Sequence, residues 1–116
     1  MAHPVVHFEI AGKDAKETQQ FYASLFDWQV DTSMMGDTYG MVNSGDGGIG
    51  GGLMATPEGR PPYITIYVQV DDLQEYLQKA ERLGAQTMMG LTEIPGGGSF
   101  AMFSDPSGNM VGLYKG

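Results

Sequence analysis

The chain has 116 residues and no cysteine, which fits one domain with its own core and excludes disulfides, thiolate metal sites and a cysteine nucleophile. Its net charge of −8 disfavours nucleic acid and anionic membranes as partners, because phosphates are bound by clustered positive charge. The start MAHPVV lacks the basic and apolar regions of a signal peptide, and no apolar run approaches the roughly 20 residues that span a bilayer, so we expect a cytoplasmic protein.

The first half of the chain has the patterns of one strand, one helix and three short strands. Residues 4–10, PVVHFEI, alternate with a period of two, which places His7 and Glu9 on one face of a strand and apolar residues on the other. Residues 11–28 predict a helix with Asp14 as its N-cap. We expect its apolar residues to cover the apolar face of the first strand: Phe21, Tyr22, Leu25, Phe26 and Trp28. Glycine-rich turns separate three further strands, near residues 28–33, 38–44 and 48–55.

The second half repeats this order after a linker rich in proline and glycine. Residues 63–70, YITIYVQV, predict a strand whose core face is formed by Ile64, Ile66, Val68 and Val70. Residues 71–85 predict an amphipathic helix that ends at Gly84. Three more strands are predicted in QTMMGLTEI, SFAMFSD and NMVGLYK.

The order β-α-β-β-β therefore occurs twice in what we interpret as a single domain, residues 1–116. The first repeat is about 1–56, the linker about 56–62 and the second repeat about 63–116. Two such units, each with its helix outside and its sheet curved inward, predict an α+β fold with a cupped, partly closed mixed sheet. Residues facing the helices would form the core, and residues on the opposite face would line a cavity.

Three stretches resemble the motifs of one superfamily: VVHFEI, FYASLFDW and the ending FSDPSGNMVGLY. With the repeated order of elements, they make the chain similar to the vicinal oxygen chelate superfamily, which includes glyoxalase I, bleomycin and fosfomycin resistance proteins, and extradiol dioxygenases. Asp27 stands where the family motif has glycine. The resemblance implies the fold and a homodimer, but not the function, because one fold hosts many chemistries.

The resemblance also implies where metal-using members hold a divalent ion. They take one ligand from the first strand and one from the last strand of each repeat. His7 matches the first ligand, whereas the other positions fall at Thr65, within the glycines 50–52, and at Gly112. A hydroxyl is a poor ligand and glycine has no side chain, so we expect no metal cofactor and a cavity widened by the glycines. The alternative is a divalent metal held by His7 and Glu9 with waters.

The candidate ligand-binding residues are those predicted to face the cavity: His7, Glu9, Thr65, Tyr67, Gln69 and Tyr114. We expect His7 to be neutral and hydrogen-bonded to a tyrosine or threonine of a neighbouring strand rather than to a metal. Glu9 would be a buried carboxylate, and burial raises the pKa of such a group toward the range useful for acid–base catalysis.

The first hypothesis for function is metal-free binding of a small, partly apolar or aromatic molecule, as the resemblance to bleomycin resistance proteins implies. The alternative is a glyoxalase-type lyase or isomerase, or a dioxygenase, in which Glu9 is the acid/base with or without a divalent metal at His7. A third hypothesis is a structural or regulatory dimer, which would apply if the chain's own side chains fill the cavity. Whether the protein is an enzyme stays open at this level.

Overall fold

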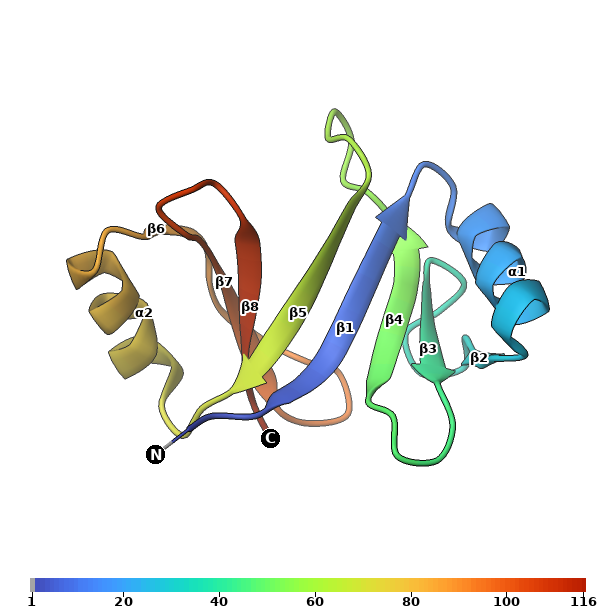
Figure 1. Ribbon diagram of the computed structural model, residues 1–116, viewed down its shortest axis with the longest axis horizontal. Helices are drawn as coiled ribbons and strands as arrows, with labels where there is room; N and C mark the ends of the chain where they lie inside the picture. Colours follow the sequence, from blue (N-terminus) through green and yellow to red (C-terminus); the bar gives the residue numbers. More distant parts are fainter. Residues whose placement is uncertain (1) are drawn as a thin grey trace. The chain divides into compact units, whose positions relative to one another are not determined.

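The structure, a computed structural model, describes residues 2–116 and confirms the α+β class and the order β-α-β-β-β in both halves (Figure 1). The first half contains β1 (Val5–Gly12), α1 (Ala15–Phe26), β2 (Gln29–Asp31), β3 (Tyr39–Asn43) and β4 (Gly50–Ala55). The second half contains β5 (Tyr63–Gln69), α2 (Leu73–Arg82), β6 (Gln86–Glu93), β7 (Ser99–Ser104) and β8 (Met110–Lys115). Within the described residues, neither helix is long and apolar enough to cross a membrane.

The chain divides into two compact units. The N-terminal unit is His7–Ile64, and the C-terminal unit is Thr65–Gly116 together with residues 2–6. The short leading segment joins the C-terminal unit because the Gln69 N–H donates to the Pro4 carbonyl at 2.9 Å. The cupped closure of the sheet stays a prediction.

In the N-terminal unit the strands lie in the order β2-β3-β4-β1. β1 pairs with β4 in parallel, from His7 opposite Gly50 to Gly12 opposite Ala55, whereas β3 is antiparallel to β4. Helix α1 begins where predicted, because the Asp14 carboxylate accepts the Glu17 N–H at 2.8 Å and satisfies a free donor of the first turn.

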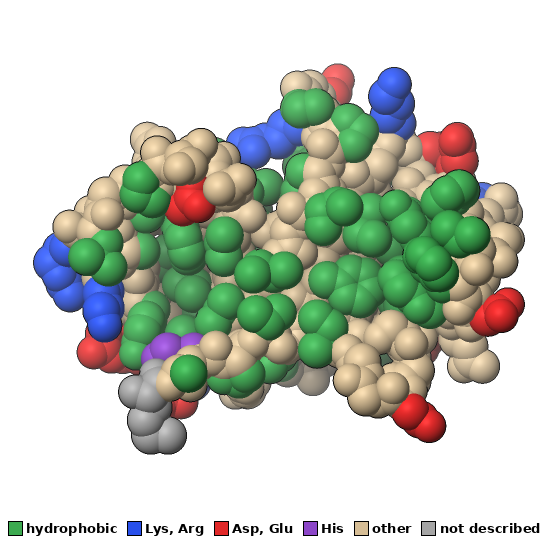
Figure 2. Space-filling model, in the orientation of Figure 1, with side chains coloured by type: hydrophobic (Ala, Val, Ile, Leu, Met, Phe, Trp, Pro, Cys, Tyr) green, Lys and Arg blue, Asp and Glu red, His purple; other side chains and the backbone are tan. Residues whose placement is uncertain are grey.

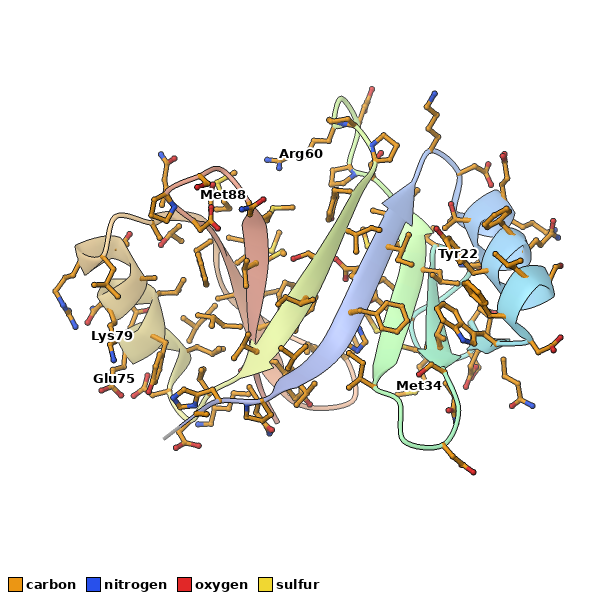
Figure 3. The ribbon with its side chains drawn as sticks, viewed as in Figure 1. Tyr22, Met34, Arg60, Glu75, Lys79 and Met88 are labelled. Carbon is orange, nitrogen blue, oxygen red and sulfur yellow. The ribbon has the colours of Figure 1, made fainter. Side chains whose placement is uncertain are left out.

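Helix α1 covers its sheet less completely than expected. Trp28, just after the helix, lies 5.4 Å from the Phe8 ring and 5.9 Å from the Tyr22 ring, so it occupies the space over β1. Tyr22 lies between α1 and the strands (Figure 3). The prediction that the other apolar residues also cover the sheet is wrong: Phe21, Leu25 and Phe26 are exposed by 57%, 57% and 52%.

A polar residue attaches α1 to the sheet instead. Gln19 is the buried residue of this helix, and its side-chain amide donates to the carbonyls of Asp37 at 3.1 Å and Leu53 at 3.2 Å. Leu53 lies at the centre of β4 and is fully buried. The helix is therefore held to β4 by one hydrogen bond and to the loop before β3 by another, as well as by apolar contact.

The C-terminal unit has strand order β5-β8-β7-β6 and a conventional core. Its cluster of buried apolar residues joins α2 to β7, β8 and the residue after β5: Val70, Leu73, Leu77, Ala101 and Leu113. Gly84 ends the helix with φ +103°, a conformation that glycine adopts at little cost, and the Ala85 N–H then reaches the Ala80 carbonyl.

The predicted apolar face of β5 is only partly buried. Val70, just after the strand, lies in the core, but Ile64 and Ile66 are exposed, contrary to expectation. The physical reason is the position of α2, which packs on β6, β7 and β8 and not on the beginning of β5.

Candidate binding site

His7 and Glu9 share a hydrogen-bonded chain with a third residue, Tyr39. The Tyr39 hydroxyl donates to Glu9 Oε2 at 2.8 Å, and His7 Nε2 lies 3.0 Å from the same hydroxyl oxygen. Tyr39 comes from β3, so its side chain extends across β4 to reach β1. His7 is thus bonded to a tyrosine, as expected, although the partner lies one strand beyond the adjacent one.

The direction of the protons follows from the chemistry of the three groups. An ionised carboxylate only accepts, so Glu9 takes the single Tyr39 proton, and the phenol oxygen then accepts from His7 Nε2–H. Burial holds the pKa of His7 below its usual value, which keeps the imidazole neutral near pH 7. The three side chains therefore form one hydrogen-bonded network that joins a neutral histidine, a phenol and a carboxylate.

Glu9 is the most chemically distinctive residue of this arrangement, because its side chain is only 5% exposed. A buried carboxylate is costly unless hydrogen bonds stabilise it, and the Tyr39 hydroxyl supplies one of these bonds. The negative charge also acts on Tyr63: burial raises the pKa of Tyr63 first, Glu9 raises it further, and the Arg60 charge partly opposes both. Tyr63 therefore stays a neutral phenol near Glu9.

The glycines of β4 do not leave empty space above them within this unit. A Cβ on Gly52 would lie 2.0 Å from the Tyr39 hydroxyl oxygen, and a Cβ on Gly51 would lie 2.3 Å from the Phe8 ring. The expectation that they widen a cavity is therefore wrong at these two positions. Gly52 instead provides the room in which Tyr39 crosses β4 to reach Glu9.

The same relation recurs in the C-terminal unit, where the other predicted site residues lie. A Cβ on Gly112 would meet the Tyr67 ring at 2.3 Å, and the buried Tyr67 hydroxyl contacts Met102 Sδ at 3.8 Å. Thr65 is buried and donates to the Met110 carbonyl at 2.5 Å. The exposed Gln69 and the half-buried Tyr114 are register partners on β5 and β8.

The residues present do not fit a divalent metal centre. Within residues 2–116, no group of three or more His, Cys, Asp and Glu side chains is placed to hold a metal ion. The two donors that do converge, His7 and Glu9, are already bridged by the Tyr39 hydroxyl. An open catalytic zinc site takes three protein ligands, and the two donors of this unit fall short of that number.

Tyr39 is the residue of this candidate site that the sequence patterns did not predict. The stretch TYGMVNS was correctly predicted as a strand, but its alternation does not show that the first aromatic ring crosses a neighbour. The available signal was the glycine run in the next strand. A strand without side chains on one face, beside a strand that begins with tyrosine, indicates that the ring occupies the vacant space.

The lowered pKa of His7 gives a pH dependence of stability. Because the folded pKa lies below the unfolded value of 6.5, the stabilisation is fully present above pH 6.5 and is lost as pH falls through 6.5 toward the folded pKa. We expect urea unfolding curves to show this loss, and we expect His7→Gln to reduce the slope of stability against pH. An unchanged slope in His7→Gln would contradict the assignment.

The order β-α-β-β-β in both units is that of the vicinal oxygen chelate fold. A family model described as Glyoxalase/Bleomycin resistance protein/Dioxygenase superfamily matches residues 5–113. The chain belongs to this family, which confirms the resemblance seen in its motifs.

Named relatives and solved structures agree with this assignment. The chain is 32% identical over 113 residues to a protein named "Putative glyoxylase CFP32" in Mycobacterium bovis and Mycobacterium tuberculosis. The match covers 88% of this chain and 41% of that relative, so the chain spans less than half of the relative's length.

Two crystal structures show the same fold at low identity. Methylmalonyl-CoA epimerase from M. tuberculosis has a TM-score of 0.71 at 15% identity, over 96% of this chain and 86% of that one. A glyoxalase/bleomycin resistance protein/dioxygenase superfamily member from Vibrio splendidus 12B01 has a TM-score of 0.69 at 16% identity, over 99% and 100%.

Proposed function

We propose that this chain binds a small, partly apolar or aromatic molecule, without a divalent metal, against the face of β1 that carries the His7–Tyr39–Glu9 chain. The observation that carries the proposal is the buried Glu9 carboxylate, oriented by a phenol from another strand. Few but well-oriented polar groups in apolar surroundings are typical of ligand sites. Thr65, Tyr67, Gln69 and Tyr114 stay predicted ligand contacts of the C-terminal unit.

The chemistry favours a ligand with a hydrogen-bond donor or a positive charge. Glu9 is an acceptor, Tyr63 is held neutral, and the chain carries a net charge of −8. An anionic molecule would meet repulsion from Glu9 in a site of low dielectric constant. A cationic or neutral aromatic molecule would not, and its ring could stack on tyrosine side chains.

The test is a thermal-shift screen with three matched probes: 1-naphthylmethylamine, 1-naphthalenemethanol and 1-naphthaleneacetic acid. A probe at ten times its Kd stabilises the fold by about 1.4 kcal/mol and raises Tm by roughly 5 °C. We expect the amine or the alcohol to give such a shift, and the acid to give none. Glu9→Gln should abolish the preference for the amine, while Tyr76→Phe, a half-buried residue of α2 in the other unit, should keep it.

Measuring the metal content of the purified protein tests whether binding is metal-free. Protein incubated with zinc, nickel, iron or manganese and then desalted should retain no stoichiometric metal. Near-stoichiometric metal that is lost in His7→Ala would overturn the metal-free proposal. Absence of a shift with every naphthyl probe would count against binding of this class of molecule.

A second candidate is proton transfer by Glu9 in a lyase, isomerase or epimerase reaction. It is supported by the contact between a buried carboxylate and a phenol, which can keep the carboxylate positioned while it accepts or returns a proton. The epimerase among the solved structures makes this reaction class worth testing. Glu9→Gln should then remove turnover of a substrate but leave its binding, whereas a pure binding protein shows no turnover in either form.

A further inference from the structure

The N-terminal unit contains a recess of about 450 Å³, bounded by the end of β1, the first half of α1 and the beginning of β5. Figure 2 shows hydrophobic side chains gathered over this unit, beside α1. Sites for small molecules commonly measure about 300–1,000 Å³ and combine apolar walls with a few polar groups. Six of the residues that line the recess give it this character: Ile10, Glu17, Thr18, Phe21, Tyr22 and Ile64.

Two aromatic rings of α1 form a wall of the recess that the unit itself holds in place. The Phe21 ring meets the Tyr22 ring edge-on, with centroids 5.0 Å apart. The Tyr22 ring is in turn stacked on Trp28 at 5.9 Å. Phe21 is nevertheless 57% exposed, so a ligand can cover much of its surface. A wall that exists before binding lowers the entropic cost of binding.

A carboxylate lies beside this aromatic wall. Glu17 and Phe21 are four positions apart on α1, so their side chains are neighbours on one face of the helix. Glu17 is the acid of the recess, and the described residues that line it include no Lys, Arg or His. Aromatic faces and carboxylates both attract cations. Both features of the recess therefore favour a ligand with a positive charge.

The aromatic wall and the carboxylate contribute unequally. Glu17 is exposed and lies in the first turn of α1, so solvent and the positive end of the helix dipole offset part of its charge. The apolar walls therefore supply most of the affinity, and the charge supplies a preference among ligands. An anionic molecule is disfavoured, because Glu17 and the net charge of −8 both repel it.

We propose that this recess is a second ligand site, which takes a small molecule with an ammonium group on an aromatic or aliphatic body. The body packs against Phe21 and Ile64, and the ammonium group lies near the Phe21 ring and the Glu17 carboxylate. The described lining residues do not include Glu9, which points to the opposite face of β1 from Ile10. The second site therefore does not depend on a ligand at Glu9.

The test is an NMR titration of the full chain with benzyltrimethylammonium, which has no N–H group to donate to Glu9. We expect a Kd of about 1 mM or below, the range for a fragment of this size. The largest amide shifts should fall in residues 10–12, 17–22 and 62–64. Shifts centred on the His7–Tyr39–Glu9 chain, without shifts at the recess, would overturn the proposal.

Two further probes test the charge preference. The neutral alcohol 2-methyl-1-phenyl-2-propanol has a similar shape and should bind about fivefold more weakly, because it loses the cation–π contact and the attraction of Glu17. Phenylacetate should give no shifts at the recess. Equal Kd values for the ammonium probe and the alcohol would contradict a site for cations.

Variants of exposed residues assign the binding to the recess. Phe21→Ala should weaken binding of the ammonium probe at least fivefold. Leu25→Ala is the matched control and should keep the wild-type Kd: Leu25 is also 57% exposed and lies one turn further along α1, but it is not among the described lining residues. Equal Kd values in these two variants would contradict the site. A sedimentation coefficient of the free protein that falls in Phe21→Ala would assign the recess to a second copy instead and overturn the proposal.

Glu17→Gln keeps the proposal testable if Phe21→Ala does not fold. This exposed substitution should weaken binding of the ammonium probe about threefold and leave binding of the neutral alcohol unchanged. Glu9→Gln should change neither Kd at the recess. Loss of ammonium binding in Glu9→Gln, with wild-type binding in Glu17→Gln, would move the site to the other face of β1 and overturn the proposal.

Discussion

Replacing Gly52 by alanine is expected to destabilise the fold by about 3 kcal/mol, the cost of overpacking a close-packed position. The new Cβ would stand 2.0 Å from the Tyr39 hydroxyl oxygen and 2.1 Å from the ring carbon that carries it. The clash is with the ring that crosses β4, so it can be relieved only by moving Tyr39. Glu9 would then lose the hydroxyl that it accepts from and would remain buried.

The matched control for Gly52 is its neighbour Gly50 in the same strand. A Cβ there meets only the Val42 carbonyl oxygen, at 3.4 Å, so Gly50→Ala should change the free energy of unfolding by less than about 1 kcal/mol. Urea unfolding measures both variants. Equal stability of the two alanine variants would show that Tyr39 does not occupy the space above Gly52.

Tyr39→Phe is expected to destabilise the fold by about 2 kcal/mol while leaving the ring in place. The variant removes one hydroxyl that serves two partners, the carboxylate of the buried Glu9 and the Nε2 of the half-buried His7. A hydrogen bond to a charged group contributes about 1.5–3 kcal/mol. In the thermal-shift screen the variant should also weaken binding of the naphthyl amine, because Glu9 is no longer oriented.

Tyr76→Phe is the control for the loss of a phenol that contacts a histidine. Its hydroxyl lies 2.8 Å from His3 Nε2 at an exposed position, where the same deletion should cost less than about 0.5 kcal/mol. A double-mutant cycle between Tyr39→Phe and Glu9→Gln isolates the pair and should give a coupling of about 1 kcal/mol or more. Additive effects would mean that the two side chains do not act together.

The order of elements could be predicted from the sequence because it depends on local patterns. Alternation in VVHFEI, the N-cap at Asp14 and the glycine at position 84 each act over a few residues, and each corresponds to the observed element or boundary. The exposure of Phe21 and Leu25 could not be predicted in the same way. Periodicity shows that a helix has an apolar side, but not that Trp28 fills the space over the sheet first.

The candidate site was predicted only in part, for a related reason. His7 and Glu9 were found because they lie two residues apart on one strand. Tyr39 was not found, because it lies 30 positions away from Glu9 in the sequence. Its side chain also crosses β4, whose glycines show no alternation of apolar and polar residues. The glycines were interpreted as open space, whereas they accommodate rings supplied by other strands.

The ring that lies over Gly52 also constrains how this protein can change over evolutionary time. A metal-ligating side chain cannot be placed at position 52 while Tyr39 is present, because the two side chains would occupy the same volume. The tyrosine would have to be replaced first, which would leave a cavity and deprive Glu9 of a hydrogen-bond donor in the intermediate sequence. Ancestral or engineered routes between this site and a metal centre must therefore pass through paired substitutions at 39 and 52, and single replacements at either position are expected to be counter-selected.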